Sequence, residues 1–509
     1  MVRSGNYLYP TFNGELRPDK PILVYWLMSV PVRLFGPHEV AIRTVAAVGM
    51  AVAALATYAA GRWLFAPRTG LLAAAVLVTT PLVLVEGSAA TTDAVLLACI
   101  TVALAGFAHA FRYGWRHTHT IVLALSMCTG LYTKGPVGLV VPLSSIALAW
   151  WLGRNTTPLR PSRLSALALA SAVAVGGFLI WAIPANTAMT GALARSGVGY
   201  HVVQRMLEPL DGHGGRLVWF LPYYLVVVVV GFFPWTFYLG GALSALRGAR
   251  LGGGAPRAVL VGWILPTFLL MSLVATKLPH YVLPIWPALA LAVAGAIHAA
   301  ERGELDDRDR RWLRRGAWPA AVTGSLMATA SVTLPRWLPA PGLGAPAMAA
   351  GLIVLAMTVV AIREVYVGRL RASVQAVLLG ALCFDGVIAA GVLPALDRLK
   401  VSPRIAAAIL ESGVADAPIL TRAYSEPSLV FYLGGRRVHG LSSDAEVARW
   451  AREPGSGTLV VPRDAWAGVE ARHGTLGFEE IAAARGYNFG RGEWLELVAL
   501  AKLTPRSPR

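Results

Sequence analysis

The stretch EVAIRTVAAVGMAVAALATYAAGRWL, residues 39 to 64, decides the class of fold. It carries no charged side chain between Arg43 and Arg62, and about 20 apolar residues are enough for an α-helix to cross a bilayer. Similar stretches recur to about residue 395. We therefore predict a mostly α, multi-span membrane protein with about twelve transmembrane helices, near residues 39–64, 69–86, 91–111, 119–134, 136–153, 163–187, 217–245, 256–276, 280–300, 316–336, 345–364 and 372–395.

The composition agrees with a membrane protein. Of the 509 residues 56% are hydrophobic and only 14% are charged, whereas about a quarter of an ordinary soluble protein is charged. The three cysteines, Cys99, Cys128 and Cys383, each lie inside an apolar stretch. This placement indicates packing residues and gives no sign of a disulfide framework or a cysteine-based metal site.

The net charge of +18 is a topology signal. The loops on one side of the predicted spans hold 19 Lys and Arg, and those on the other side hold six. By the positive-inside rule the first set is cytoplasmic. The predicted location is thus the cytoplasmic (inner) membrane, with the N-terminal segment, the loop 187–216 and the C-terminal tail facing the periplasm or cell exterior. Because the arginines are spread over short loops, we predict no nucleic-acid partner.

The chain divides by composition into three parts. Residues 1–38 are predicted to form an external loop and a juxtamembrane helix, residues 39–396 the transmembrane domain, and residues 397–509 a soluble external domain. In this tail SPRIAAAILESG has the pattern of a helix, whereas APILTRAY, SLVFYLG, GTLVVP and WLELVALA resemble short strands bounded by Gly and Pro. A small α/β domain is therefore expected.

Ionisable residues gather at the predicted external ends of the spans, where such side chains are costly and often functional. Five separate segments supply them: Asp19 and Lys20; Asp93; Lys134; His201 and Arg205; and Lys277, His280 and Tyr281. Lys, Arg and Tyr suit a phosphate whose lipid tail stays in the membrane, and carboxylates beside them suit acid/base chemistry or metal binding.

Each of these residues also has a structural explanation. Lys20 and Lys277 could extend along the apolar surface to reach the interface, and Asp93 could cap the helix that begins TTDAVLL. His201 could be a solvated loop residue. The concentration of such residues on one face favours a functional site.

Several motifs in their order resemble the polytopic glycosyltransferases that use lipid-phosphate sugar donors (families 39 and 83). This group contains the protein O-mannosyltransferases and, closer, the aminoarabinose transferase that modifies lipid A. The motifs are PDKPILVYWLMSVPVRLFG, TKGPVGLVVP, HVVQRMLEPLDGHG, KLPHYVLPIWPALAL, SLVFYLGGRRV and GYNFGRGEWLELVAL, and they span nearly the whole chain.

The resemblance implies a GT-C-type membrane domain with an external C-terminal α/β domain. It also implies transfer of a sugar from a polyprenyl-phosphate carrier to a lipid A-like glycolipid or a protein on the outer face of the membrane. By analogy Lys20, Arg205 and Tyr281 hold the carrier phosphate, with Lys134 and Lys277 as further cations. Asp93 then corresponds to a carboxylate of the sugar site. Asp19 and His201 match positions that can bind a divalent metal, although no cofactor is expected to be required.

The sequence departs from this family at its start. Family members have a further transmembrane helix, followed by a loop whose acidic motif supplies the expected catalytic base, whereas MVRSGNYLYPTFNGEL aligns with the segment after that motif. We therefore expect the catalytic carboxylate upstream of Met1. The alternatives are a truncated, catalytically silent paralogue, or a transporter or flippase of a lipid-linked substrate, which would place its charged site near the membrane midplane between repeats.

Overall fold

The structure is a computed structural model that describes residues 1–155, 160–204, 222–248, 250–413 and 417–502, without the side chains of 198–203. By internal contacts the chain forms two compact units, which are described separately. The first comprises Met1–Pro10, Leu16–Ala330 and Gly351–Asp385. The second comprises Thr11–Glu15, Ser331–Ala350 and Gly386–Arg509.

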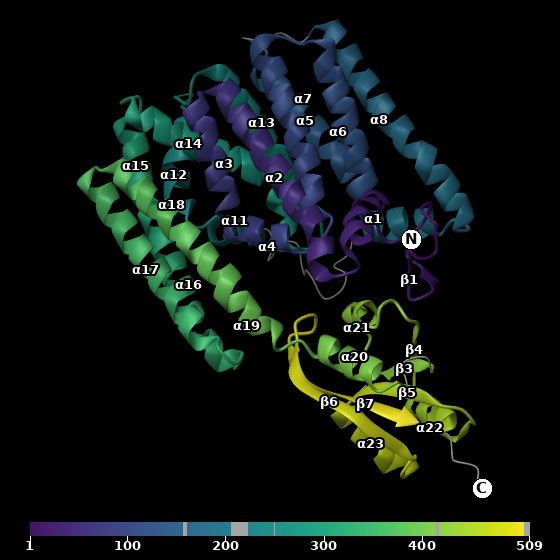
Figure 1. The fold of residues 1–509 in the computed structure, drawn as a ribbon. Coiled ribbons are helices and arrows are strands. Elements are labelled where there is room, and N and C mark those ends of the chain that lie inside the picture. Colours follow the sequence, from purple (N-terminus) through teal and green to yellow (C-terminus); the bar gives the residue numbers. More distant parts are fainter. Residues whose placement is uncertain (156–159, 205–221, 249, 414–416, 503–509) are drawn as a thin grey trace, which may run out of the picture. The chain divides into compact units, whose positions relative to one another are not determined.

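The first unit is helical (Figure 1). Three helices, α16, α17 and α18, begin or end in the second unit. The helices up to that point in the chain are α1 (Leu23–Phe35), α2 (Glu39–Leu64), α3 (Pro67–Val78), α4 (Pro81–Ser88), α5 (Asp93–Tyr113), α6 (His117–Lys134), α7 (Val137–Leu152), α8 (Pro161–Ala188), η1 (Leu193–Gln204), α11 (Tyr223–Gly231), α12 (Thr236–Arg247), α13 (Gly254–Leu273), η2 (Pro279–Ile285), α14 (Trp286–Glu301), α15 (Asp307–Arg315), α16 (Ala317–Trp337), α17 (Gly344–Val367) and α18 (Leu370–Val387).

Each of the twelve predicted apolar stretches is mostly helical where the structure describes it. Two of them are bent: α3 and α4 meet at 67°, and α11 and α12 at 116°. Pro81 and Pro234 lie at these breaks, where proline removes a backbone donor and interrupts the helix. Within the described part of the chain, seven helices are long and apolar enough to cross a membrane, or nine if each bent pair is one span. The number twelve stays a prediction.

Small residues bring neighbouring helices together. A Cβ atom on Gly61 of α2 would lie 2.6 Å from the Gly70 Cα atom of α3, and one on Gly130 of α6 would lie 2.9 Å from the Gly138 Cα atom of α7. Such close backbone approach is typical of helix pairs in membranes. The helix α5 lies inside the unit, because 78% of an apolar 18-residue stretch of this helix is buried. Only 17% of the corresponding stretch of α8 is buried. The start of α5 is therefore held in a fixed place.

The second unit contains a five-stranded sheet in the order β4-β3-β5-β7-β6. Strand β3 pairs in parallel with β4 and β5, and β7 pairs antiparallel with β5 and β6. The small C-terminal α/β domain predicted from the sequence is thus present. Its elements are α19 (Leu393–Asp397), preceded by the π-helix η3 (Ile388–Val392), then α20 (Val401–Glu411), β3 (Ile419–Arg422), α21 (Pro427–Tyr432), β4 (Val438–Leu441), α22 (Asp444–Arg452), β5 (Gly457–Pro462), α23 (Arg463–His473), β6 (Phe478–Asn488) and β7 (Glu493–Lys502).

One predicted strand in this domain is wrong. The stretch SLVFYLG forms most of the helix α21. Pro427 occupies the first turn of that helix, where its fixed φ favours helix initiation. Leu429, Val430 and Leu433 are buried, and their spacing of one and four residues places them on one helical face.

Candidate active site

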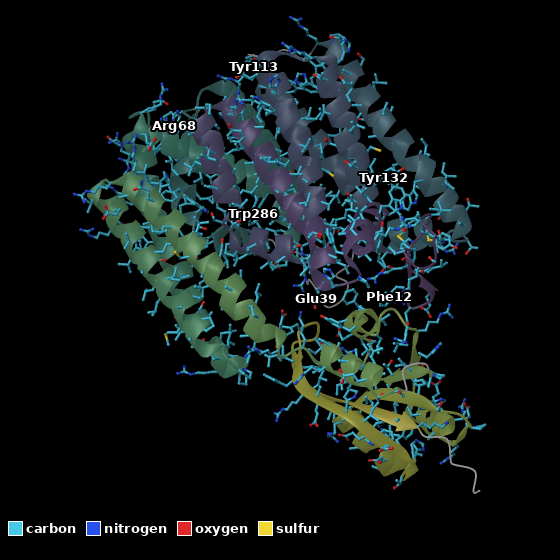
Figure 2. The ribbon with its side chains drawn as sticks, viewed as in Figure 1. Phe12, Glu39, Arg68, Tyr113, Tyr132 and Trp286 are labelled. Carbon is cyan, nitrogen blue, oxygen red and sulfur yellow. The ribbon has the colours of Figure 1, made fainter. Side chains whose placement is uncertain are left out.

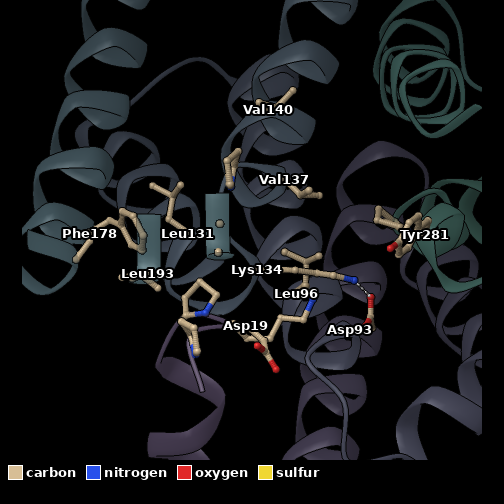
Figure 3. A pocket seen from close by; sticks show the side chains of 18 of the residues that line it. Asp19, Asp93, Leu96, Leu131, Lys134, Val137, Val140, Phe178, Leu193 and Tyr281 are labelled. Atoms are coloured by element: carbon tan, nitrogen blue, oxygen red, sulfur yellow. Dashed lines mark hydrogen bonds and ion pairs between the residues drawn. The ribbon is translucent and has the colours of Figure 1, made fainter. Parts of the chain in front are cut away.

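The start of α5, the end of α6, the start of η2 and the segment before α1 meet around one cavity of 480 Å³ (Figure 3). Figure 2 shows the surrounding side chains on the ribbon. Six of the nine residues singled out in the sequence line this cavity: Asp19, Lys20, Asp93, Lys134, His280 and Tyr281. They come from four segments between residues 19 and 281. The structure therefore brings six of the nine residues together around one cavity.

Asp93 and Lys134 form the closest pair of charges in the cavity. The Lys134 Nζ atom donates to Asp93 Oδ1 at 2.6 Å, and only 14% and 9% of the two side chains are exposed. Figure 3 shows Lys134 extending from the end of α6 toward Asp93 at the start of α5. Lys134 Nζ also lies 5.0 Å from the centre of the Tyr281 ring, a favourable cation–π distance. Lys134 thus holds Asp93 and Tyr281 in one arrangement.

Glu86 is a member of this cluster that the sequence reasoning missed. Its Oε1 atom lies 3.5 Å from His280 Nδ1, and His280 Nε2 lies 3.9 Å from Asp93 Oδ2. The Thr91 hydroxyl donates to Glu86 Oε2 at 2.8 Å, and Glu86 is only 6% exposed. Since it begins the stretch EGSAATTDAV and is a carboxylate at membrane depth, the same rule that selected Asp93 could have selected it.

Asp19 and Lys20 reach the cavity from the segment before α1. Asp19 forms an ion pair with Arg17 at 3.3 Å, and both side chains are more than one-third exposed. Lys20 lines the same cavity as Asp93. The first segment therefore adds one acid and one base to the rim of the cavity, beside the more deeply buried Asp93.

The rest of the cavity wall is apolar. It is built by α6, α7, α8 and α13, which contribute Leu131, Val137, Val140, Phe178, Ile183 and Leu270. Figure 3 shows Leu131, Phe178 and Leu193 on the side away from Asp93. A cavity with a charged end and an apolar end can hold an amphiphile, with its polar head near Lys20 and its hydrocarbon along these helices.

Lys277 has a different environment from the one predicted. It is only 4% exposed and is not among the described residues that line the cavity. Its Nζ atom donates to the carbonyl of Ser272 at 2.5 Å and to that of Met271 at 3.3 Å, and it lies 5.3 Å from the Tyr224 ring centre. Burial lowers the pKa of this ammonium. Lys277 thus satisfies the last carbonyls of α13, and its role in binding the carrier phosphate stays a prediction.

Two predicted residues cannot be placed in the site. His201 falls in the backbone of η1, but its side chain lies outside the described residues, as does all of Arg205. The described residues include no group of three His, Cys, Asp or Glu side chains that could hold a metal ion. The metal site at Asp19 and His201 therefore stays a prediction, and no step of the chemistry below depends on it.

Comparison with known proteins identifies relatives. Residues 19–194 match the profile of the dolichyl-phosphate-mannose-protein mannosyltransferases, a segment that includes Asp19, Lys20, Asp93 and Lys134. An undecaprenyl phosphate-α-4-amino-4-deoxy-L-arabinose arabinosyl transferase from Edwardsiella ictaluri is 29% identical over 308 residues, which cover 58% of this chain and 53% of that protein. A second such transferase, from Sodalis glossinidius, is 31% identical over 306 residues, or 58% of this chain and 52% of that protein. The chain thus matches about half the length of these relatives.

The fold agrees with a solved structure over the whole chain. ArnT from Cupriavidus metallidurans, bound to undecaprenyl phosphate, superimposes with a TM-score of 0.76 at 19% sequence identity, covering 100% of this chain and 93% of ArnT. The apo form gives a TM-score of 0.73. The protein is therefore a membrane protein with an ArnT-like fold, related in sequence to the dolichyl-phosphate-mannose-protein mannosyltransferases over residues 19–194 and to the aminoarabinose transferases over more than half of its length.

Proposed function

We propose that this protein is an integral-membrane glycosyltransferase that moves a sugar from a polyprenyl-phosphate carrier to an acceptor at the outer face of the cytoplasmic membrane. The single observation that carries the proposal is the cavity with two chemically different ends. Its charged end suits a phosphate and a sugar, and its apolar wall suits a polyprenyl chain.

The relatives support this choice of ligand. The transferases similar to this chain are named for an undecaprenyl-phosphate donor, and the ArnT structure holds undecaprenyl phosphate. For this chain we propose only the class of ligand, a sugar-bearing polyprenyl phosphate. The acceptor is a lipid A-like glycolipid or a protein, and membrane lipid surrounds the enzyme.

In the proposed reaction the bond between the anomeric carbon and the phosphate oxygen breaks, and its electron pair stays on the carrier phosphate. The acceptor oxygen forms the new bond to the anomeric carbon, and where the acceptor is a hydroxyl its proton passes to a carboxylate that acts as general base. Lys20, the Tyr281 hydroxyl and, by the family resemblance, Arg205 are proposed to bind the phosphate and to offset its growing negative charge. Electrostatic stabilisation of this kind is usually the largest contribution to catalysis.

Asp93 is proposed to bind hydroxyl groups of the sugar. Its Oδ1 atom is already committed to Lys134 at 2.6 Å, which keeps the carboxylate ionised and fixed in direction. Because the Lys134 ammonium is engaged in this way, its main proposed role is to hold Asp93. This differs from the direct phosphate contact predicted from the sequence.

The orientation is also a proposal. The excess of Lys and Arg in one set of loops supports an orientation in which the opposite set, with the cavity residues and the C-terminal domain, lies outside the cytoplasm. A divalent metal at Asp19 and His201 remains an optional addition to this site.

The first prediction tests the carrier site in the purified full chain. Lys20→Met should weaken binding of undecaprenyl phosphate by about tenfold or more, because a hydrogen bond to a charged group contributes about 1.5–3 kcal/mol. Binding of the neutral polyprenol should change little, since it lacks the phosphate. Titration monitored by native mass spectrometry measures both affinities.

The matched control is Lys400→Met, which removes a lysine ion-paired with Asp397 in the second unit and should leave both affinities unchanged. Equal loss of polyprenol and polyprenyl phosphate in the Lys20 variant would refute the phosphate role. An assay for transfer of labelled sugar from a polyprenyl-phosphate donor then distinguishes the proposed transferase from the alternative functions. Binding without transfer would favour the silent paralogue or the transporter.

A further inference from the structure

A short basic helix lies between two apolar helices, and the helix α14 separates it along the chain from the cavity residues His280 and Tyr281. This helix, α15 (Asp307–Arg315), has the sequence DRDRRWLRR and joins α14, which ends at Glu301, to α16, which begins at Ala317. Five of its nine residues are arginines, and all five are exposed: Arg308, Arg310, Arg311, Arg314 and Arg315.

The arginines share one face, with Asp307 at its N-terminal end. At about 100° per residue they occupy roughly 160° of the helix circumference, whereas Asp309 and Leu313 point to the opposite side. Trp312 lies at the border between these two faces and is 40% exposed, with the Arg315 guanidinium 5.2 Å from its ring centre. Trp318, in the first turn of α16, is 72% exposed.

The buried side of α15 holds the helix firmly on α12. The fully buried Asp309 carboxylate accepts hydrogen bonds from Ser244 Oγ at 2.7 Å and from Arg250 Nε at 2.5 Å. The backbone also approaches closely, since a Cβ atom on Gly240 of α12 would lie 2.7 Å from the Trp312 carbonyl oxygen. The arginine face is therefore fixed in orientation by its anchor.

The carboxylates near α15 are mostly committed to other arginines. Glu301 pairs with Arg371 at 2.7 Å, Glu304 with Arg302 at 2.6 Å, and Asp306 with Arg250 at 3.1 Å. Asp307 lies in the first turn, where a negative charge favours the helix dipole. Within the described part of the chain, none of the five arginines of α15 has an ion-pair partner.

We propose that the arginine face of α15 binds the phosphate groups of anionic phospholipids, with Trp312 at the boundary between headgroups and acyl chains. Arginine binds phosphate bidentately, and a cluster of this size next to a membrane helix is typical of sites for anionic lipid. Exposed tryptophan is enriched at the same depth of the bilayer. This site is separate from the proposed catalytic cavity and does not depend on the proposed transferase activity.

The test uses the full chain reconstituted with equal amounts of phosphatidylglycerol and phosphatidylcholine. Native mass spectrometry then counts each lipid that remains bound. The double variant Arg311→Gln/Arg315→Gln should lower the ratio of bound phosphatidylglycerol to phosphatidylcholine by about tenfold or more, since each arginine contributes about fivefold near a charged surface. The wild-type preference should weaken as salt is raised.

The helix α22 provides a matched control, because it also begins with acidic residues and carries exposed arginines in its last turn. Arg449→Gln/Arg452→Gln removes the same charge and should leave the lipid ratio unchanged. Arg311→Lys/Arg315→Lys should retain most of the preference and shows that a loss in the Gln variant is one of charge. Unchanged lipid retention in the Gln variant, an equal loss in the α22 variant, or displacement of the lipid by soluble glycerophosphate would each overturn the proposal.

Discussion

At the scale of single residues, two lysines in similar sequence contexts have different environments. Lys134 in TKGP and Lys277 in TKLP each follow an apolar helix and precede a proline. Lys134 pairs with Asp93 in the cavity, whereas Lys277 donates to the carbonyls of its own preceding helix. The Asp93 carboxylate lies opposite Lys134. The environment of each lysine is therefore set by the partner that the fold brings to it and not by its local sequence motif.

Asp93 shows the same dependence on its partner. As a helix-starting residue it could have been a simple cap, but the structure shows no side-chain cap at the start of α5. Its hydrogen bond goes to Lys134, on a different helix. The structure therefore favours the interpretation of Asp93 as a cavity residue over its interpretation as a helix cap.

The second prediction concerns Glu86. Glu86→Ala should lower sugar transfer by about tenfold, equivalent to about 1.4 kcal/mol, because His280 loses the carboxylate beside its Nδ1 atom. The Thr91 hydroxyl also loses its acceptor, which should destabilise the protein by roughly 1–3 kcal/mol. Transfer assays and thermal unfolding of the same sample measure the two effects.

Glu86→Gln separates these effects. The amide oxygen can still accept from Thr91, so stability should largely return while transfer stays low. If Glu86→Gln transfers sugar as fast as the wild type, the charge of Glu86 has no role in the site.

At the scale of elements, the important polar interactions of this protein lie at the ends of helices. The site is made where α5 begins and α6 ends, and α15 is positioned by one buried carboxylate. Burial alone would raise the pKa of Asp309, but the hydrogen bonds from Arg250 and Ser244 outweigh it, so the pKa lies below its usual value. The ionised form is therefore the one that the folded state prefers.

The third prediction follows from the lowered pKa of Asp309. The stabilisation is fully present above the usual aspartate pKa of about 4, and it is lost as pH falls through the lower folded-state value. Asp309→Ala should cost roughly 3 kcal/mol at neutral pH, since it leaves Arg250 without its buried partner. The substitution should also make Tm less dependent on pH in the acid range.

Thermal unfolding of the purified protein across the acid range tests this dependence. Asp307→Ala removes an exposed carboxylate from the same helix and should leave Tm nearly unchanged at every pH. A wild-type and an Asp309→Ala curve that run parallel into acid would contradict the assignment.

At the scale of the whole molecule, the start of the chain takes part in the last domain. The turn Asn13–Gly14 joins β1 (Thr11–Phe12) and β2 (Glu15–Leu16). Asn13 Nδ2 donates to the Val438 carbonyl at 2.6 Å, and the Val438 N–H donates to Asn13 Oδ1 at 2.7 Å. The asparagine amide thus pairs with the edge strand β4 as a neighbouring peptide would. Because Lys20 follows seven residues later, the chain itself links this contact to the cavity segment.

The fourth prediction is that Asn13→Ala exposes this edge. The loss of both hydrogen bonds should cost roughly 1–3 kcal/mol and increase amide exchange in peptides that contain Val438. Asn6→Ala removes an asparagine whose Oδ1 atom accepts only a local bond, from the Leu8 N–H at 2.9 Å, and should leave these peptides unchanged. Hydrogen exchange measured by mass spectrometry compares the variants, and equal protection in both would contradict the contact.

Much of this fold could be predicted because apolar runs of membrane length have few alternatives. The helices α2 and α8 begin and end within two residues of their predicted limits. The bends at Pro81 and Pro234 and the helical state of SLVFYLG were missed, because hydrophobicity alone does not distinguish a bent helix from a straight one or a short helix from a strand.

The sequence by itself determined that this is a helical membrane protein with a small α/β domain, and it marked most of the charged residues that share one cavity. These properties follow from hydrophobicity and from the cost of charge in a membrane, which act on each segment separately. Only the tertiary structure decided which charges pair. Lys134 and Asp93 are 41 positions apart, whereas Lys277 donates to the carbonyls of its own preceding helix. Such pairing depends on distances between side chains of different helices, which helix packing sets and no single segment encodes.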